Sequence, residues 1–298
     1  MTAAPDIDVV VVAYRSADDL RDCVSPLAGR EGIHVIVVDN ACPARSCETV
    51  RDLDVTIVEA GRNGGFAAGV NVGVAAGTAS AVLLLNPDAR IGPDGVRRLA
   101  KVLADRPTAG IVAPRITAPD GDLHWSLRRF PRVRSTFAQA VGLHRLLPQA
   151  SWVDELVRDP AAYATGHEVD WASGAALLVR RSLLAALGGL DEGFFMYCED
   201  KDLCRRARDA HHDVRFEPAA VVSHEGGASA PRADLSPTLA ASRVRYARKH
   251  ESRLHAEVER IGVALTALTH MVAGRGGRAA RAGHARALRA AFRTVNVA

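Results

Sequence analysis

Three acidic side chains stand within four positions of one another, directly after an apolar aromatic run. Glu199, Asp200 and Asp202 follow residues 194–197, which read Phe-Phe-Met-Tyr. An acidic first turn suits the dipole of a helix, so helix capping would explain these residues without any chemistry. The aromatic neighbourhood, however, partly desolvates a carboxylate and raises its pKa, as a general base requires. The segment is a candidate for general base catalysis, with helix capping as the alternative.

A second candidate is the turn Asn86-Pro87-Asp88, which ends an apolar run. Proline fixes such a turn and directs the Asp88 carboxylate to the carboxyl edge of a sheet. One carboxylate there, with phosphate oxygens and water, is a common way to hold Mg²⁺ or Mn²⁺ beside a nucleotide. A solvated aspartate in an Asx turn is the alternative. His224 ends a later apolar segment, and a lone histidine is more often structural than a ligand.

A glycine-rich segment spans residues 61–73, where Gly65, Gly69 and Gly73 recur every four positions. This spacing places them on one face of a helix, where the missing side chains permit close backbone approach. The segment matches neither GxGxxG nor GxxxxGK[ST], and it follows the third predicted strand rather than the first. The pattern therefore argues against a dinucleotide-binding Rossmann site.

The elements that must position these residues alternate between strand-like and helix-like patterns over the first 115 residues. Apolar runs predict strands at residues 7–13, 33–38, 55–58, 81–85 and 111–113. Amphipathic patterns predict helices at residues 17–27, 67–76 and 93–104. This alternation indicates βαβ units in a mostly parallel, doubly wound α/β sheet, which binds ligands beyond the carboxyl ends of its strands. The segments 14–16, 39–40 and 86–88 all follow predicted strand ends.

The rest of the chain is less regular. Prolines punctuate residues 117–168 and predict irregular connections with short helices. A second ordered block, residues 169–224, is expected to hold a strand at 175–179, a short helix ending at Gly188, a helix at 199–210 and a strand through Val221. The stretch after Gly226 has a helical pattern.

Composition excludes several classes of protein. The chain has 298 residues, of which 48% are hydrophobic and 24% charged, as in ordinary globular proteins. Its 14 aromatic side chains and the lack of a basic stripe interleaved with them argue against binding of single-stranded nucleic acid. No apolar run approaches a membrane span and no signal peptide pattern is present. Disulfides and structural zinc are not expected, because no CxxC pair occurs among Cys23, Cys42, Cys47, Cys198 and Cys204. A reducing cytoplasm fits best.

Seven short motifs, taken in chain order, resemble the family 2 glycosyltransferases of GT-A fold, and among them the bacterial rhamnosyltransferase-like branch. The motifs lie at residues 10–14, 37–40, 63–73, 85–89, 172–175, 199–203 and 224, so the resemblance covers about residues 6–230. It implies a Rossmann-like nucleotide-sugar-binding half with a mostly parallel sheet at 1–115. An acceptor and catalytic half of the same domain would follow at 116–230, and a helical, Arg-rich extension at 231–298.

The resemblance also assigns roles to residues. The donor would contact Ala13, Tyr14, Asp39, Asn63, Phe66, Gly69, Asn71, Asn86 and Asp88. Asp200 would be the general base with Glu199 beside it, and Mg²⁺ or Mn²⁺ would be held by Asp88 and His224. The acceptor side would be formed by Trp171, Ser173 and Gly174. Two positions depart from the family: Asn86 replaces the first acid of its DxD motif, and Val70 stands where many members have Arg, which leaves Arg62 as the candidate for that diphosphate contact.

The implied activity is that of an inverting hexosyltransferase in bacterial cell wall or polysaccharide biosynthesis. It would move a sugar, with rhamnose the first expectation, from a dTDP- or UDP-sugar to a hydroxyl of a glycan or polyprenyl-linked acceptor. A nucleotidyltransferase is an alternative, but it should carry a glycine-rich basic loop after the first strand, where Tyr14-Arg15-Ser16 stands. A non-catalytic nucleotide-sugar-binding module would not need the acids near residue 200. Nucleic acid is not an expected partner.

The C-terminal tail has six Arg and no acid over residues 275–298. Its pattern predicts a basic amphipathic helix with Arg286, Arg289 and Arg293 on one face and Leu288, Phe292 and Val295 on another. Gly274, Gly276 and Gly277 predict a flexible join. Such a helix can bind an anionic membrane surface, such as the inner face of the plasma membrane. The alternatives are packing on the domain or on the second subunit of a homodimer.

Overall fold

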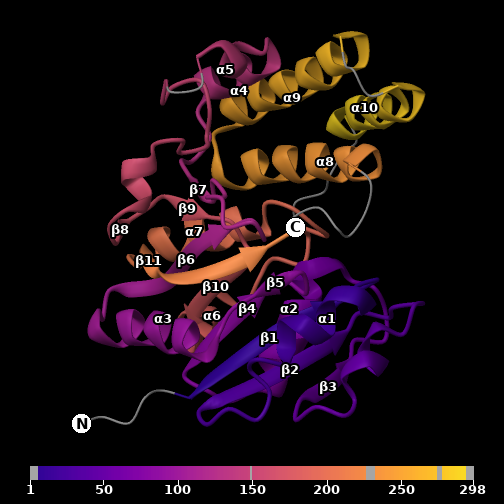
Figure 1. Ribbon diagram of the computed structural model, residues 1–298. Coiled ribbons are helices and arrows are strands. Elements are labelled where there is room, and N and C mark those ends of the chain that lie inside the picture. The colour runs from indigo at the N-terminus through magenta and orange to yellow at the C-terminus, as the bar shows by residue number, and fades with distance from the viewer. Residues whose placement is uncertain (1–5, 148–149, 226–231, 274–276, 293–298) are drawn as a thin grey trace. The chain divides into compact units, whose positions relative to one another are not determined.

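The computed structural model describes residues 6–147, 150–225, 232–273 and 277–292 (Figure 1). The chain forms two compact units. The first, here called the sheet unit, comprises residues 1–128, 160–192 and 199–229. The second, the helical unit, comprises residues 129–159, 193–198 and 230–298. The chain therefore passes between the units several times.

The sheet unit is built on a nine-stranded sheet in the order β3-β2-β1-β4-β10-β6-β11-β5, with β8 paired to β11. Its strands are β1 (Ile7–Ala13), β2 (Ile33–Asp39), β3 (Thr56–Glu59), β4 (Ala81–Leu85), β5 (Ala89–Arg90), β6 (Ala109–Thr117), β8 (His167–Glu168), β10 (Ala176–Arg180) and β11 (Asp213–His224). Strands β3, β2, β1 and β4 are parallel, as are β6 and β11, while β10 runs antiparallel between β4 and β6. A separate antiparallel pair joins β7 (Leu127–Arg128) to β9 (Trp171–Ala172). The predicted mostly parallel α/β sheet is confirmed.

Helices cover both faces of this sheet. They are α1 (Ala17–Val24), α2 (Gly65–Ala76), α3 (Pro93–Asp105), α6 (Arg181–Leu187) and α7 (Glu199–Asp209), with 3₁₀ turns at Ser46–Val50 and Pro160–Tyr163. Alternate residues of β1, such as Val9 and Val11, share one buried cluster with Leu20 of α1 and Leu99 of α3. The intervening residues of β1 face α2. Every residue of β1 is buried between these layers, and the strand is apolar except for Asp8, whose carboxylate pairs with Arg181 and accepts the N–H of Ala79.

Helix α2 lies close to β1 because its contact face is made of glycine. A Cβ atom added to Gly69 would lie 2.6 Å from Cγ1 of Val12, and one added to Gly73 would collide with Val10. The predicted glycine stripe on one helix face thus packs on the sheet. This packing fixes the position, relative to the sheet, of the loop that precedes α2.

The helical unit consists of α4 (Val133–Ala140), α5 (Leu143–Leu146), α8 (Arg232–His250), α9 (Arg253–Ala273) and α10 (Gly277–Phe292). Its core contains small and branched side chains, among them Val244, Val263, Ala267, Ala287 and Ala291. These come from α8, α9 and α10, which pack together. No helix in the described part of the chain is both long and apolar enough to cross a membrane.

The C-terminal helix packs on other helices of its unit, which is one of the arrangements that its sequence left open. Helix α10 buries its small residues Gly283, Ala287 and Ala291, whereas Phe292, expected on the apolar face, is largely exposed beneath the guanidinium of Arg260. The small residues form the helix–helix contact because they let the helices approach closely. The guanidinium of Arg286 pairs with Asp234 of α8 at 2.9 Å. Gly274, Gly276, Arg293 and Val295 lie outside the described residues.

The glycine contact of α2 gives a stability prediction. Gly69→Ala should lower the free energy of unfolding by about 1–3 kcal/mol, because the added Cβ forces Val12 or the helix to move. Gly92→Ala is the control, since a Cβ there meets nothing within 4 Å. Urea denaturation measures both. A Gly69→Ala variant as stable as the control would contradict the close packing.

Candidate active site

The carboxyl ends of β1, β2 and β4 lie at one edge of the sheet. The register pairs Ala13 with Asp39 and Val11 with Leu85, so the loops after the three strands leave the sheet side by side. These loops carry many of the residues predicted to bind the donor. The backbone therefore confirms that the segments after these strands lie at the carboxyl edge of the sheet.

Asn40 organises the loop before α2. Its side chain is buried, and its Nδ2 donates to Oδ1 of Asn63 at 3.0 Å and to the carbonyl of Gly65 at 3.2 Å. Its Oδ1 accepts the N–H of Gly64 at 3.3 Å. Asn40 belongs to the motif at residues 37–40, and no role was predicted for it. The structure shows it holding Asn63 and the first turn of α2 in place.

The loops after β1 and β2 are also joined by hydrogen bonds. Oδ1 of Asp39 accepts the N–H of Cys42 at 2.9 Å, and the Cys42 sulfur accepts the N–H of Arg15 at 2.9 Å. Burial alone would raise the pKa of the Cys42 thiol, but hydrogen bonds from Ser46 and Arg15 outweigh it and lower that pKa. The guanidinium of Arg15 lies 5.5 Å from the centre of the Tyr14 ring. Tyr14 and Asp39 thus border one loop cluster.

Asp88 and His224 meet although 136 residues separate them. His224 Nε2 lies 3.1 Å from Oδ1 of Asp88, and both side chains are largely buried. They are brought together because β11 pairs antiparallel with β5, so His224 faces Ala89. Burial alone would raise the pKa of Asp88, but the hydrogen bond and charge of His224 outweigh it, and the pKa lies below the usual value.

These two residues fit a divalent cation. A carboxylate oxygen and an imidazole nitrogen are ligands that Mn²⁺ accepts, and nucleotide-bound cations take their other ligands from phosphate and water. No group of three or more His, Cys, Asp or Glu suited to a metal occurs among the described residues.

Two further side chains, those of His124 and Asn86, lie beside His224. The His124 ring stacks on His224 with centroids 6.0 Å apart and an interplanar angle of 15°. The Nδ2 atom of Asn86 lies 3.5 Å from His224 Nε2. His124 was not predicted to belong to the site, because the segment around it has no strand or helix periodicity. Asn86, where the family has an acid, faces the same imidazole.

The candidate base is held at a defined position. Oδ2 of Asp200 accepts the N–H of Gly174 at 2.8 Å, and its Oδ1 accepts the N–H of Lys201 at 2.7 Å. A Cβ atom on Gly174 would lie 3.0 Å from Cβ of Asp200, so glycine permits this approach. Ser173, beside it, donates its N–H to the carbonyl of Ser126 at 3.0 Å. The structure thus joins Asp200 to the predicted acceptor segment.

Glu199 and Asp200 occupy different environments. Glu199 is buried, and burial together with the charges of Asp200 and Asp202 raises its pKa to about 8. Asp200 is partly exposed. Of the two adjacent carboxyl groups, Asp200 is the one that the surroundings leave accessible. Trp171, also buried, carries Arg128 and Lys201 at 5.2 and 5.4 Å from its ring centre.

Asn71 has a different set of contacts from the other predicted donor residues. Its Nδ2 donates to the carbonyl of Leu190 at 3.0 Å and to Glu192 at 3.1 Å, and its Oδ1 accepts the N–H of Leu190 at 2.8 Å. The side chain therefore fastens the loop after α6 to α2. Phe66 and Gly69 lie on the same helix.

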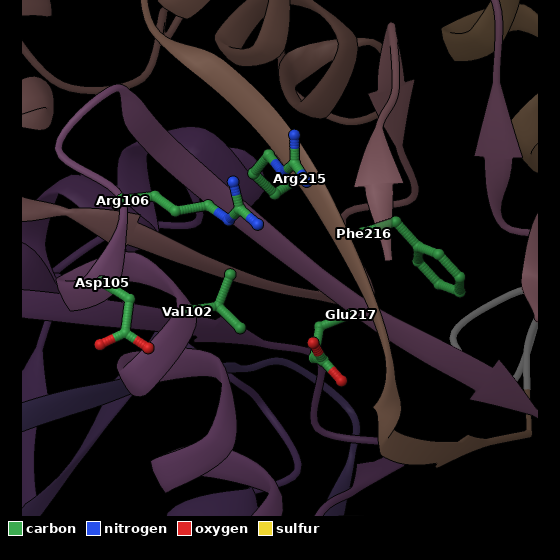
Figure 2. Close-up of a pocket in the computed structure, with 6 residues that line it drawn as sticks. All are labelled: Val102, Asp105, Arg106, Arg215, Phe216 and Glu217. Atoms are coloured by element: carbon green, nitrogen blue, oxygen red, sulfur yellow. The ribbon is translucent and has the colours of Figure 1, made fainter. Parts of the chain in front are cut away.

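A pocket of about 400 Å³ lies elsewhere in the sheet unit (Figure 2). It is lined by charged and apolar side chains at the end of α3 and the start of β11, namely Val102, Asp105, Arg106, Arg215, Phe216 and Glu217. His224 is at the other end of β11. None of the predicted site residues lines this pocket.

Comparisons with known proteins identify the family of this chain. A family model described as Glycosyl transferase family 2 matches residues 8–170. N-acetylglucosaminyl-diphospho-decaprenol L-rhamnosyltransferase of Mycobacterium tuberculosis is 31% identical over 79% of this chain and 80% of its own length. Rhamnosyltransferase WbbL of Escherichia coli is 31% identical over 48% of this chain and 51% of its own.

Solved structures show the same fold. Mannosyltransferase PcManGT from Pyrobaculum calidifontis, in complex with GDP-Man and Mn²⁺, superposes with a TM-score of 0.57 at 19% identity, covering 97% of this chain and 86% of its own. GalNAc-T7 with UDP, GalNAc and Mn²⁺ gives a TM-score of 0.60 at 12% identity over 83% of this chain and 48% of that one.

The environment of Glu199 gives a pH prediction. Its pKa is near 8 in the folded chain against the usual 4.5, so folding takes up a proton in that interval and the free energy of unfolding falls as the pH rises through it. The glutamine of Glu199→Gln cannot ionise. The free energy of unfolding of this variant should therefore fall less between pH 5 and pH 8 than that of the wild type, by about 1–3 kcal/mol. Urea denaturation at both pH values measures this. Glu31→Gln, at an exposed position, should follow the wild type, and equal slopes in all three proteins would refute the assignment.

Proposed function

The chain belongs to glycosyl transferase family 2 and is a glycosyltransferase, and from this premise we propose that it transfers rhamnose with inversion of the anomeric centre. The donor would be a dTDP- or UDP-sugar. The acceptor would be a hydroxyl group of a polyprenyl-linked glycan, in line with the diphospho-decaprenol in the name of the Mycobacterium tuberculosis relative. The observation that carries the proposal is the Asp200 carboxylate, hydrogen-bonded to Gly174 at 2.8 Å.

Asp200 would act as the general base. Each of its oxygens accepts one backbone N–H, from Gly174 and Lys201, so the carboxylate keeps its orientation and a lone pair remains for a proton. As Asp200 takes the proton of the acceptor hydroxyl, that oxygen forms a bond to the anomeric carbon. The bond from this carbon to the phosphate oxygen breaks, and its electron pair leaves with the nucleoside diphosphate. Attack opposite the leaving group inverts the anomer.

Asp88 and His224 would hold the divalent cation, Mg²⁺ or Mn²⁺. When bound, such a cation stabilises the negative charge that develops on the diphosphate. Asp88 contributes the anionic ligand, and its lowered pKa keeps the carboxylate ionised at neutral pH. His224 is oriented by its contact with Asp88 and by the stacked ring of His124.

The remaining predicted residues would position the two substrates. Asn40 holds Asn63 and the start of α2, which supports a donor site formed with Tyr14 and Asp39. On the acceptor side, the buried ring of Trp171 holds the positive charge of Arg128 5.2 Å from its centre. A ring beside a guanidinium suits a sugar linked to a diphosphate. Enzyme action would then take place at the inner face of the plasma membrane.

Asp200→Asn tests the base. The amide oxygen can still accept the N–H of Gly174 but takes no proton, so turnover should fall by about two to four orders of magnitude while donor affinity is retained. Initial rates with dTDP-rhamnose and isothermal titration of the donor measure the two quantities. Asp209→Asn, at the exposed end of the same helix, is the control. Near-normal turnover in Asp200→Asn with an inactive Glu199→Gln would move the role to Glu199.

Asp88→Ala tests the cation site. A donor that binds the folded protein raises its melting temperature, and Mn²⁺ should enlarge that rise in the wild type. In Asp88→Ala the additional rise with Mn²⁺ should disappear. The melting temperature without ligand should also fall, because His224 loses its buried carboxylate partner. Thermal scans over a panel of dTDP-, UDP- and GDP-sugars with and without Mn²⁺ also identify the nucleotide of the donor. An unchanged response to Mn²⁺ would rule out Asp88 as a ligand.

A further inference from the structure

The helical unit exposes an apolar stripe along α9. Leu254, Ile261, Leu268 and Val272 follow one another at spacings of seven, seven and four residues, which places them on one face of the helix. Leu254 is 75% exposed and Val272 is 73% exposed. The opposite face of α9 carries Val263 and Ala267, which are buried in the core of the unit. Helix α9 is therefore apolar on both faces, and only one of them is covered within its unit.

The neighbouring helix α4 extends this surface. The hydroxyl of Thr269 donates to the carbonyl of Ala140 at 3.0 Å, so the end of α4 lies beside the second half of the stripe. Val141, the next residue, is 66% exposed. In the short helix α5 that follows, Leu146 is exposed as well. Large apolar side chains at such exposed positions are typical of an interaction surface.

The unit that carries the stripe is strongly basic. Residues 129–159, 193–198 and 230–298 contain 18 Arg and Lys against seven Asp and Glu, a net charge of +11. The sheet unit carries the remaining −7 of the net +4. Helix α10 contains no acid, and its Arg278, Arg281 and Arg289 are exposed. Exposed apolar side chains on a cationic unit complement a surface that is anionic outside and apolar beneath.

We propose that the stripe of α9 rests in the interfacial layer of a membrane containing anionic phospholipid. The apolar side chains would enter the boundary between headgroups and acyl chains, while the exposed Arg side chains bind lipid phosphates. The helix would lie along the surface without crossing it. This inference rests on the proposed function, because a polyprenyl-linked acceptor is itself embedded in the membrane.

Charge favours a bilayer over a second copy of the chain as the occupant of the stripe. Two copies meeting through α9 would bring two units of net charge +11 together, whereas anionic lipid neutralises them. A stable protein interface also takes roughly 20–30 residues from each side, and the stripe offers far fewer. The contact differs from the amphipathic tail expected from sequence, since α10 buries its small residues inside the unit and presents its Arg side chains outward.

Sedimentation of full-length protein with vesicles tests the proposal. The vesicles are phosphatidylcholine alone or with about 30% phosphatidylglycerol. The variant Leu254→Asp/Leu268→Asp places charge in the stripe. The control is Leu239→Asp in α8, which changes a leucine with the same 42% exposure as Leu268 in the same unit. Wild type and control should pellet with the anionic vesicles, less so at high salt, and the double variant should partition at least about a hundredfold more weakly.

Light scattering and thermal unfolding accompany the assay. An unchanged melting temperature of the double variant shows that its weaker vesicle binding does not come from unfolding. If the double variant does unfold, the single exposed substitution Val272→Asp replaces it, and vesicle binding should then weaken by about tenfold. Equal pelleting of wild type and a folded stripe variant would overturn the proposal, as would a wild-type dimer that the substitution converts to monomers without changing vesicle binding. The assay uses neither donor nor acceptor, so a failure of the proposed sugar transfer would show separately, as wild-type protein that pellets but has no turnover.

Discussion

The parallel pairing of β1 with β2 and β4 is the constraint on which the candidate site depends. It forces three strands to end at one edge and three loops to begin there, which brings Tyr14, Asn40 and Asn86 near one another from segments far apart in the chain. The pairing in turn requires strands that are apolar on both faces, and β1 and β4 are buried along their whole length. The charged residue within β1, Asp8, is fully buried and is paired with Arg181.

Within this frame, long-range contacts of single side chains set the chemistry. His224 reaches Asp88 only because β11 returns to pair with the two-residue strand β5. Asp200 meets Gly174 because that glycine has no side chain to displace the carboxylate. The first contact joins the first 115 residues to the later part of the sheet unit, and the second lies within that later part. Burial raises the pKa of Glu199, whereas the neighbouring Asp200 is partly exposed.

The sequence predicted the central strands well and the side-chain contacts poorly. Strands β1 and β4 begin and end where expected, because a fully buried strand is a continuous apolar run with polar residues at both ends. Strand β6 is longer than its apolar part, since Pro114 and Arg115 continue its pairing with β11. The role of Asn40 and the stacking of His124 were missed because neither has a local pattern. The roles assigned to individual donor and acceptor residues stay predictions.

The separation of charge between the two units changes what the isoelectric point means. A value near 9.0 describes an average over a chain in which one unit carries +11 and the rest −7. Electrostatic fields decay over about 8 Å at physiological ionic strength, which is less than the size of either unit. A surface or a charged solute therefore meets one unit at a time. It experiences a net positive charge near the helical unit and a net negative charge near the sheet unit.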